Sequence, residues 1–254
     1  MSWNPALYLR FADQRLRPAL DLLARVDLDA PDTVADLGCG AGNVTLYLKR
    51  RWPDARVTGI DNSPTMLGKA RATGENIAWE TGELATWAPD EPLALLYSNA
   101  ALQWADHHAE LFPRLAGLVQ PDGVLAVQMP HQNGGPSHQA AFTLAQSPRW
   151  RQALQPVVRE SPVAEPQCYY DWLTPHFKTL DIWETEYLQI MEGDDPVADW
   201  TSSTFLRPFL DALEGEERLA FDQAYRALIR EAYPQRTDGK TLFPFRRLFI
   251  VGRR

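Results

Sequence analysis

Residues 34–43 read Val-Ala-Asp-Leu-Gly-Cys-Gly-Ala-Gly-Asn, and this stretch decides the fold. An apolar run leads into glycines at positions 38, 40 and 42, and a helical pattern follows. Glycine tolerates positive φ and lets backbone N–H groups approach a ligand closely. The stretch therefore predicts a strand, a ligand-binding loop and a helix. A tight turn without a ligand is the simpler alternative, but three alternating glycines after an acid exceed what a turn needs.

The spacing of these glycines argues against a nicotinamide dinucleotide. The dinucleotide pattern G-x-G-x-x-G requires a glycine five positions after Gly38, and this chain has Asn43 there. The loop therefore departs from the dinucleotide-binding pattern.

Short apolar runs alternate with amphipathic stretches on both sides of this loop. This rhythm is typical of βαβ units and predicts an α/β fold with a mostly parallel sheet whose last strand is antiparallel. Pro53 is expected to end the first helix, and Ser63 with Pro64 to begin the second. The predicted strands are Thr33–Leu37, Arg56–Ile60, Ile77–Glu80, Leu93–Asn99, Val124–Met129, Leu180–Met191 and Arg247–Val251.

The pattern changes after Pro130, where turn residues and prolines interrupt the alternation. We expect three sections: an N-terminal lid and helix over 1–30, a ligand-binding core over 31–130, and the remaining strands over 131–254. A helical insertion at about 194–233 is expected to bind the second substrate.

Composition narrows the class of protein further. The chain has 254 residues, 45% hydrophobic and 23% charged, which is enough for a sizeable core. Its net charge of −8 does not favour binding to nucleic acid or to an anionic membrane, both of which are negatively charged. No apolar run is long enough to span a bilayer, and the first residues lack the basic and then apolar pattern of a signal peptide, so we expect a cytoplasmic protein. Cys39 and Cys168 have no metal-binding spacing, so we expect no metal. The sequence leaves the oligomeric state open and is compatible with a monomer.

Asp61 ends the second predicted strand, where a carboxylate can accept hydrogen bonds from both hydroxyls of a ribose. The following Asn62 and Ser63 would also suit an ordinary turn, which is the alternative reading.

The glycine loop resembles the D-x-G-x-G-x-G loop of class I S-adenosylmethionine-dependent methyltransferases, which have a Rossmann-like sheet. This resemblance implies S-adenosyl-L-methionine as cofactor, S-adenosyl-L-homocysteine as product, and an adenine slot after the third strand. Trp87 could line that slot or serve only as core. The cofactor-binding residues that the resemblance implies are Asp36, Gly38, Cys39, Gly40, Asn43, Asp61, Asn62, Met66, Glu83, Leu84, Asn99 and Ala100.

Nearly the whole chain is similar to the family of bacterial trans-aconitate 2-methyltransferases. The landmarks that carry the similarity are Trp3–Phe11, Arg17–Pro18, Val34–Asn43, Gly59–Asp61, Ser98–Trp104, Val124–Pro130, Leu206–Pro208 and Arg247–Val251. This resemblance implies a small polycarboxylate as substrate, which becomes a monomethyl ester.

A polycarboxylate needs cations to hold the carboxylates that do not react, and guanidinium groups bind carboxylates at two points. Arg17, Arg207 and Arg247 are the substrate residues predicted from this need for cations. The other predicted substrate residues, which lie in or beside the landmark segments, are Tyr8, Trp104 and His131. A surface ion pair is the alternative for each arginine, packing against the sheet is the alternative for Tyr8, and solvation in a polar loop is the alternative for His131. No general base is required, because a carboxylate is already ionised at neutral pH; Arg207 and Arg247 would act by positioning.

The chain departs from the family pattern at His131–Gln132, Ala41 and Thr204–Phe205. Two alternatives therefore stay open. One is a class I methyltransferase for another small molecule, such as a different carboxylate, a phenol or an amine, in which His131 would act as base. The other is a non-catalytic module that binds the cofactor.

Overall fold

The structure, a computed structural model, describes residues 12–132, 134–159 and 161–254. The chain forms two compact units, each assembled from separate segments. The sheet unit contains Leu16–His131, Pro162–Thr185 and Arg247–Arg254, and the helical unit contains Gln132–Ser161 and Glu186–Arg246.

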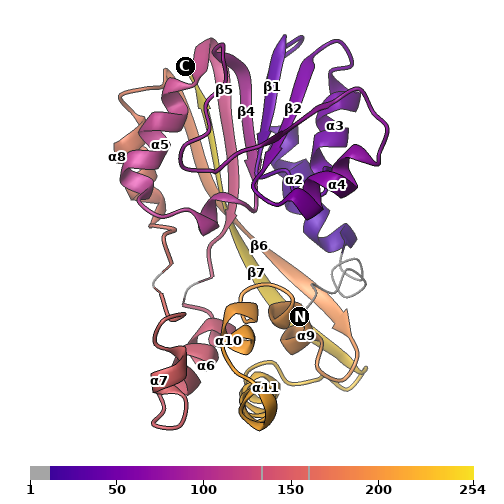
Figure 1. The fold of residues 1–254 in the computed structure, drawn as a ribbon, viewed down its shortest axis with the longest axis vertical. Helices are drawn as coiled ribbons and strands as arrows, with labels where there is room; N and C mark the ends of the chain where they lie inside the picture. Colours follow the sequence, from indigo (N-terminus) through magenta and orange to yellow (C-terminus); the bar gives the residue numbers. More distant parts are fainter. Residues whose placement is uncertain (1–11, 133, 160) are drawn as a thin grey trace. The chain divides into compact units, whose positions relative to one another are not determined.

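Seven strands form one sheet in the order β3-β2-β1-β4-β5-β7-β6 (Figure 1). Strands β1 to β5 run parallel, and β7 pairs antiparallel with β5. The predicted α/β class, the mostly parallel sheet and the antiparallel last strand are therefore confirmed. The strands are β1 (Thr33–Leu37), β2 (Arg56–Asp61), β3 (Ala78–Thr81), β4 (Leu93–Asn99), β5 (Val119–Pro130), β6 (Thr179–Glu192) and β7 (Lys240–Arg253).

Strands β5 and β7 are much longer than the sequence predicts, and β2 and β6 extend slightly beyond their predicted bounds. β5 begins at Val119 because Pro121–Gly123, which looks like a turn, lies within the strand beside a register shift between Leu93 and Leu95. Asp122 has φ 63° there. An irregularity of this kind lets a strand continue through residues that would otherwise end it.

Helices cover both faces of the sheet unit, with α2, α3 and α4 on one side and α5 and α8 on the other (Figure 1). Ser63 caps α4 and Pro64 is its first residue, as predicted, because the Ser63 hydroxyl accepts from the N–H of Met66 at 3.3 Å. The bounds are α2 (Ala12–Ala24), α3 (Asn43–Arg51), α4 (Pro64–Arg71), η1 (Leu102–Trp104), α5 (His108–Gly117) and α8 (Pro166–Leu173).

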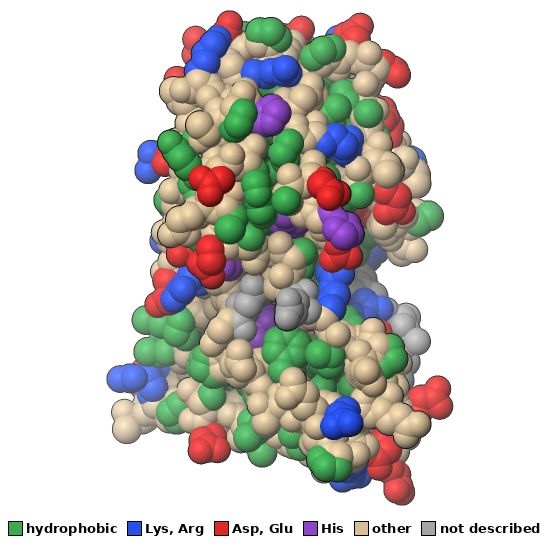
Figure 2. Space-filling model, turned by 90° about the vertical axis from the view of Figure 1, so that its left-hand side faces the viewer, with side chains coloured by type: hydrophobic (Ala, Val, Ile, Leu, Met, Phe, Trp, Pro, Cys, Tyr) green, Lys and Arg blue, Asp and Glu red, His purple; other side chains and the backbone are tan. Residues whose placement is uncertain are grey.

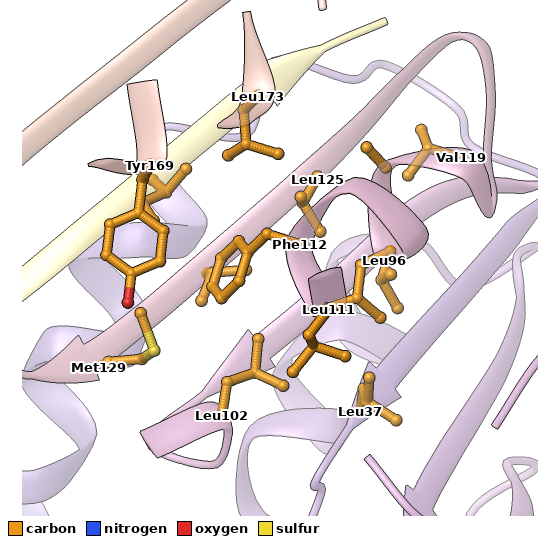
Figure 3. Packing of buried hydrophobic residues seen from close by; sticks show 14 of the residues in the cluster. Leu37, Leu96, Leu102, Leu111, Phe112, Val119, Leu125, Met129, Tyr169 and Leu173 are labelled. Carbon is orange, nitrogen blue, oxygen red and sulfur yellow. The ribbon is translucent and has the colours of Figure 1, made fainter. Parts of the chain in front are cut away.

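The main core lies between the sheet and helices α5 and α8, where the rings of Phe112 and Tyr169 pack edge to face at 4.7 Å (Figure 3). A series of buried hydrogen bonds runs through this core. His108 Nε2 lies 3.0 Å from the carbonyl oxygen of Leu102, which can only accept, so Nε2 carries the proton. His108 Nδ1 therefore accepts from the Tyr169 hydroxyl at 2.6 Å. This series of hydrogen bonds ties α5 and α8 to the segment that follows β4.

The helical unit contains α6 (Pro136–Ala145), α7 (Arg151–Leu154), α9 (Pro196–Ser202), α10 (Arg207–Asp211) and α11 (Gly215–Ala232). The last three confirm the predicted helical stretch between the two late strands. His138 lies against the ring of Phe205 with centroids 3.8 Å apart, and burial lowers the pKa of His138 to about 4. Trp150 packs on Phe221, with ring centroids 5.2 Å apart.

Acidic and basic side chains are interspersed on the face shown in Figure 2, with no broad basic area. Within the described part of the chain, no helix is both long and apolar enough to cross a membrane.

Candidate functional site

In an open parallel sheet, ligands bind beyond the carboxyl ends of the strands, at the point where the strand order reverses. Here that point lies between β1 and β4, because β1 pairs with β2 on one side and with β4 on the other. The predicted cofactor residues lie at the carboxyl ends of β1, β2 and β4, or in the segments that follow β1, β2, β3 and β4.

The glycine loop between β1 and α3 needs its glycines. Gly38, Gly40 and Gly42 have φ values of 82°, 56° and 82°, which residues with a Cβ rarely adopt. A Cβ on Gly38 would lie 2.1 Å from the Cβ of Ala101, whereas a Cβ on Gly40 would meet no atom of the described residues within 4 Å. Among the residues that the structure describes, Gly40 therefore faces open space, while Gly38 is packed against the segment after β4.

Asp61 holds this loop in place. Its Oδ2 accepts from the N–H of Gly40 and its Oδ1 from the N–H of Ser63, both at 2.9 Å. The carboxylate thus joins the glycine loop to the start of α4. An ordinary turn at Asp61–Ser63, the alternative reading of the sequence, would not by itself predict the bond to the glycine loop. Each oxygen keeps a lone pair for a ribose hydroxyl, so the predicted ribose contact remains possible chemically and stays a prediction.

Asp36 is buried within the sheet unit, with 2% of its surface exposed. The hydroxyl of Thr45, in α3, donates to its Oδ2 at 2.6 Å. Burial raises the pKa of Asp36 to about 7, although the Thr45 hydrogen bond lowers it. Asp36 therefore anchors α3 under the glycine loop, and its predicted contact with the cofactor stays a prediction.

The segment after β3 brings two predicted cofactor residues together. The side-chain amide of Asn62 donates to Glu83 Oε2 at 3.2 Å. Arg114, from α5, donates to the carbonyls of Leu84 and Trp87 at 3.2 and 2.9 Å and fixes this segment from below. The indole N–H of Trp87 donates to Glu80. Leu84 and Trp87 pack against the main core, so Trp87 has at least the core role considered above.

The other cofactor residues predicted near the loop lie at helix starts or beneath it. Asn43 is the first residue of α3, and Met66 lies in the first turn of α4. Cys39 is buried, and burial together with Asp36 and Asp61 raises the pKa of its thiol well above the usual value. Cys39 is thus a packed thiol that stays protonated at neutral pH.

After β4 the backbone is strained: Ala100 has φ 53°, a left-handed conformation that is uncommon for alanine. Its N–H donates to the carbonyl of Gln128 in β5 at 2.9 Å, and its carbonyl accepts from the side chain of Gln103 at 2.7 Å. Asn99, the preceding residue, has a buried Oδ1 without a hydrogen-bond partner among the described residues. These features place an unsatisfied acceptor at the strand-order reversal.

The residues at this edge fit the cofactor that the sequence implies. Open space above Gly40, carboxylates at Asp61 and Glu83, and the unpaired oxygen of Asn99 suit a ligand with hydroxyl and ammonium donors. The side chains of Leu84 and Met66 offer apolar contacts to a ring.

The three predicted arginines differ in environment. Arg247 is 6% exposed and lies in β7, paired with Pro130 of β5. Arg207, in the helical unit, has a side chain 40% exposed and bonds Asp211 at 3.2 Å. The side chain of Arg17, in α2, is 72% exposed and lies 3.9 Å from Asp21. Burial singles out Arg247, and the substrate roles of all three stay predictions.

His131 follows β5 and is 9% exposed. Its Nδ1 lies 2.6 Å from Glu184 Oε1, and its Nε2 lies 3.8 Å from Glu165 Oε1. The alternative of a solvated histidine does not hold for His131, because its side chain is buried beside two carboxylates, and its predicted substrate role stays a prediction. Trp104, in η1, is 52% exposed. Tyr8 lies outside the described residues, which begin at residue 12 and so include only the later part of the expected lid and helix over 1–30.

Two hollows in the described surface lie elsewhere. One, of about 410 Å³, is lined by residues at the amino ends of β1, β4 and β5, among them Asp32, Ala94 and Gln120. The other, of about 190 Å³, lies beside α9 and α11. None of the predicted site residues lines either one.

Sequence reasoning missed Thr45, Arg114 and Gln128. Thr45 and Arg114 lie on helices and carry no motif, so only the folded contacts reveal them. Gln128 did carry a signal, since it is the one polar residue of the apolar run Val124–Met129.

The chain is similar to known methyltransferases. The family described as "Methyltransferase domain" matches residues 34–123. A trans-aconitate 2-methyltransferase of Methylobacterium radiotolerans is 48% identical over 99% of this chain and 98% of its own length. A protein of the same name from Streptomyces coelicolor is 48% identical over 100% of this chain and 87% of its own length.

Among solved structures, the YcgJ protein of Bacillus subtilis aligns with a TM-score of 0.60 at 14% identity, over 94% of this chain and 98% of its own, and supports the fold alone. The full-length likeness to the two curated relatives is far stronger. On that likeness, this chain belongs to the trans-aconitate 2-methyltransferase family of class I methyltransferases.

Proposed function

We propose that this protein transfers the methyl group of S-adenosyl-L-methionine to one carboxylate of trans-aconitate and releases a monomethyl ester and S-adenosyl-L-homocysteine. The observation that carries the proposal is the similarity to relatives of that name over nearly the whole chain. That similarity extends beyond the cofactor half into residues 131–254, where acceptor residues are expected.

The residues of the sheet unit would hold the cofactor. S-adenosyl-L-methionine supplies an electrophilic methyl group attached to a positively charged sulfur. Asp61 would accept from the ribose while it fixes Gly40, and Glu83 with Leu84 would border the adenine. Asn99 Oδ1 would accept from the ammonium group of the methionine half.

The acceptor carboxylate needs no deprotonation, since its pKa lies near 4 and it is ionised at neutral pH. Catalysis is then placement: oxygen, methyl carbon and sulfur must align at about 3 Å, which can contribute roughly 7–11 kcal/mol in favourable intramolecular comparisons. Arg247 and Arg207 would bind carboxylates that do not react, which sets affinity and selectivity.

We further propose that the enzyme works in the cytoplasm on a small polycarboxylate, without nucleic acid or membrane. The net charge of −8 and the interspersed surface charges support this part of the proposal (Figure 2).

The test is methyl transfer from labelled S-adenosylmethionine to trans-aconitate, with cis-aconitate, isocitrate and citrate in parallel. We expect trans-aconitate to be the best acceptor by kcat/KM. Binding of the cofactor without transfer to any of the four acids would contradict the acceptor assignment and keep the cofactor assignment.

One observation favours a second candidate, a methyltransferase for a phenol or an amine. The imidazole of His131 bonds Glu184 at 2.6 Å, as a general base oriented by a carboxylate does. A pH–rate profile separates the two functions. A phenol or amine acceptor would give an acidic limb that His131→Ala abolishes, whereas a carboxylate acceptor would give no such limb.

A further inference from the structure

Gln128 is an unexplained polar residue in the interior of the sheet unit. It lies near the carboxyl end of β5 and is 1% exposed. Neither its Nε2 nor its Oε1 has a hydrogen-bond partner among the described residues. A buried amide without partners destabilises a fold, and a methionine or leucine at this position would not. The amide therefore requires an explanation beyond packing.

The strand register shows which face Gln128 occupies. It pairs with Asn99 in β4 and with Phe249 in β7. Directly paired residues, and those two apart on one strand, share a face of the sheet. Arg247, two residues before Phe249, therefore lies diagonally across from Gln128. The neighbours Val127 and Met129 belong to the main core on the other face, where Met129 is labelled together with Phe112 and Tyr169 (Figure 3).

Asn99, Gln128 and Arg247 thus follow one another across β4, β5 and β7 on a single face. Asn99 is at the strand-order reversal, where the cofactor is expected, and Arg247 is the most distant of the three from that point. The backbone carbonyl of Gln128 accepts a hydrogen bond from the N–H of Ala100. This bond connects Gln128 to the strained segment after β4. Gln128 lies between the expected methyl donor and a buried guanidinium.

We propose that the side-chain amide of Gln128 binds the methyl-accepting carboxylate of the substrate through Nε2, while Arg247 binds a second carboxylate. This inference rests on the proposed function and extends it to the residue that holds the nucleophile. The amide oxygen of Gln128 stays available to a water or a polarised C–H donor at the same point.

The chemistry of the transfer explains a neutral group at this position. One carboxylate oxygen forms a bond to the methyl carbon, the carbon–sulfur bond breaks, and its electron pair stays on sulfur. The carboxylate loses its negative charge and the sulfur its positive charge, and no proton moves. A cation beside the nucleophile would stabilise the charge that disappears and would slow the reaction, whereas an amide orients the oxygen with less of that penalty. A cation suits the bystander carboxylate, whose charge persists.

The test compares wild-type enzyme with Gln128→Met, which has a similar size, and with Gln128→Glu, which adds a negative charge. Gln120→Met, at the amino end of β5, is the matched control. Measured quantities are kcat and KM for trans-aconitate, acceptor binding by calorimetry in the presence of S-adenosylhomocysteine, S-adenosylhomocysteine binding alone, and Tm.

We expect Gln128→Met to keep or raise the Tm, to bind S-adenosylhomocysteine as wild type does, and to lose about 10- to 100-fold in kcat/KM, the effect of one hydrogen bond to a charged group. Gln128→Glu should lose more and should also fail to bind the acceptor. The control should match wild type in all measurements.

The outcomes separate this inference from the proposed function. Wild-type methylation of trans-aconitate with unchanged constants in Gln128→Met overturns the inference alone. Wild-type acceptor binding without methylation, abolished in Gln128→Glu, supports the inference and contradicts the proposed function. A wild-type protein that neither binds nor methylates any of the four acids overturns both.

Discussion

The backbone N–H of Gly40 donates a hydrogen bond to Asp61 Oδ2 at 2.9 Å, so the residue expected to bind the ribose also holds the glycine loop. The other oxygen of Asp61 accepts from Ser63. Loss of the carboxylate would therefore disturb the loop and the start of α4 together, in addition to any direct contact with the cofactor.

Asp61→Asn should weaken S-adenosylhomocysteine binding by roughly 10- to 100-fold, because an amide offers one acceptor oxygen where the carboxylate offers two. Calorimetric titration measures this, with the exposed residue Asp54 changed to Asn as control. The trans-aconitate KM at saturating cofactor should change little. Wild-type affinity in Asp61→Asn would exclude Asp61 from the cofactor site.

Asp36 should make stability fall as pH rises. Its folded pKa of about 7 exceeds the unfolded value of 3.8, so the folded protein retains a proton that the unfolded chain has lost between these pH values. The stabilisation is complete below the unfolded pKa and is lost as pH approaches the folded pKa.

Asp36→Asn should remove that dependence, since the amide oxygen still accepts from Thr45 and carries no charge. Between pH 4 and pH 8 the free energy of unfolding of the variant should rise relative to that of wild type by up to about 4 kcal/mol. This figure is the pKa shift of Asp36 multiplied by the free energy that corresponds to one pKa unit. Urea unfolding at both pH values measures the difference. A constant difference between variant and wild type would show that Asp36 titrates normally.

The strands around this site could be predicted from the sequence because their signals are local. Runs such as Leu93–Asn99 are apolar and end in polar residues, and the structure has β4 at those bounds. The start of β5 could not be predicted, because Pro121–Gly123 has turn composition and makes its backbone hydrogen bonds with Arg254, at the far end of the chain, rather than with β4. The two interleaved units likewise depend on contacts between distant segments.

Single residues of the site follow the same rule. Gly38 and Asp61 were predictable, since a motif and a strand end mark them. Thr45 and Glu184 were not, because Thr45 meets Asp36 and Glu184 meets His131 only after α3 packs on the sheet and β6 joins it. The hydrogen-bond partners of site residues therefore depend on tertiary packing and cannot be derived from the spacing of residues in the sequence.

His108 gives the opposite pH dependence. Burial lowers its pKa, so stability falls as pH drops below the unfolded value of 6.5. His108→Leu should lose this dependence between pH 7 and pH 5 while being less stable at pH 7. Tyr169→Phe, which leaves Nδ1 without its donor, should cost about 1–3 kcal/mol at pH 7. Thermal unfolding at both pH values checks each variant, and equal slopes in wild type and His108→Leu would contradict this assignment.

Arg247→Ala should raise the trans-aconitate KM by roughly 10- to 100-fold and lower kcat far less, because a bystander carboxylate keeps its charge in the transition state. Arg207→Ala should act in the same direction. Arg17→Ala serves for comparison, since its side chain is mostly exposed beside Asp21. Steady-state kinetics distinguish the cases, and an unchanged KM would remove that arginine from the acceptor site.

Gly38 and Gly40 should separate folding from binding when each is changed to alanine. Both have positive φ, which costs an alanine about 1–2 kcal/mol. In Gly38→Ala the new Cβ also lies 2.1 Å from the Cβ of Ala101, so the segment after β4 must move, and the loss of stability should exceed about 3 kcal/mol. In Gly40→Ala the Cβ enters open space, so stability should fall only by the backbone cost.

Gly40→Ala should affect cofactor binding more than it affects stability. Gly40→Ala should stay folded and bind S-adenosylhomocysteine at least about 10-fold more weakly, because the added methyl group would occupy the space in which the cofactor is expected and would strain the backbone whose N–H donates to Asp61. Urea unfolding and calorimetry on the same samples measure both effects. Wild-type affinity in a folded Gly40→Ala protein would place the cofactor away from this loop and would remove the main structural support for the proposed reaction.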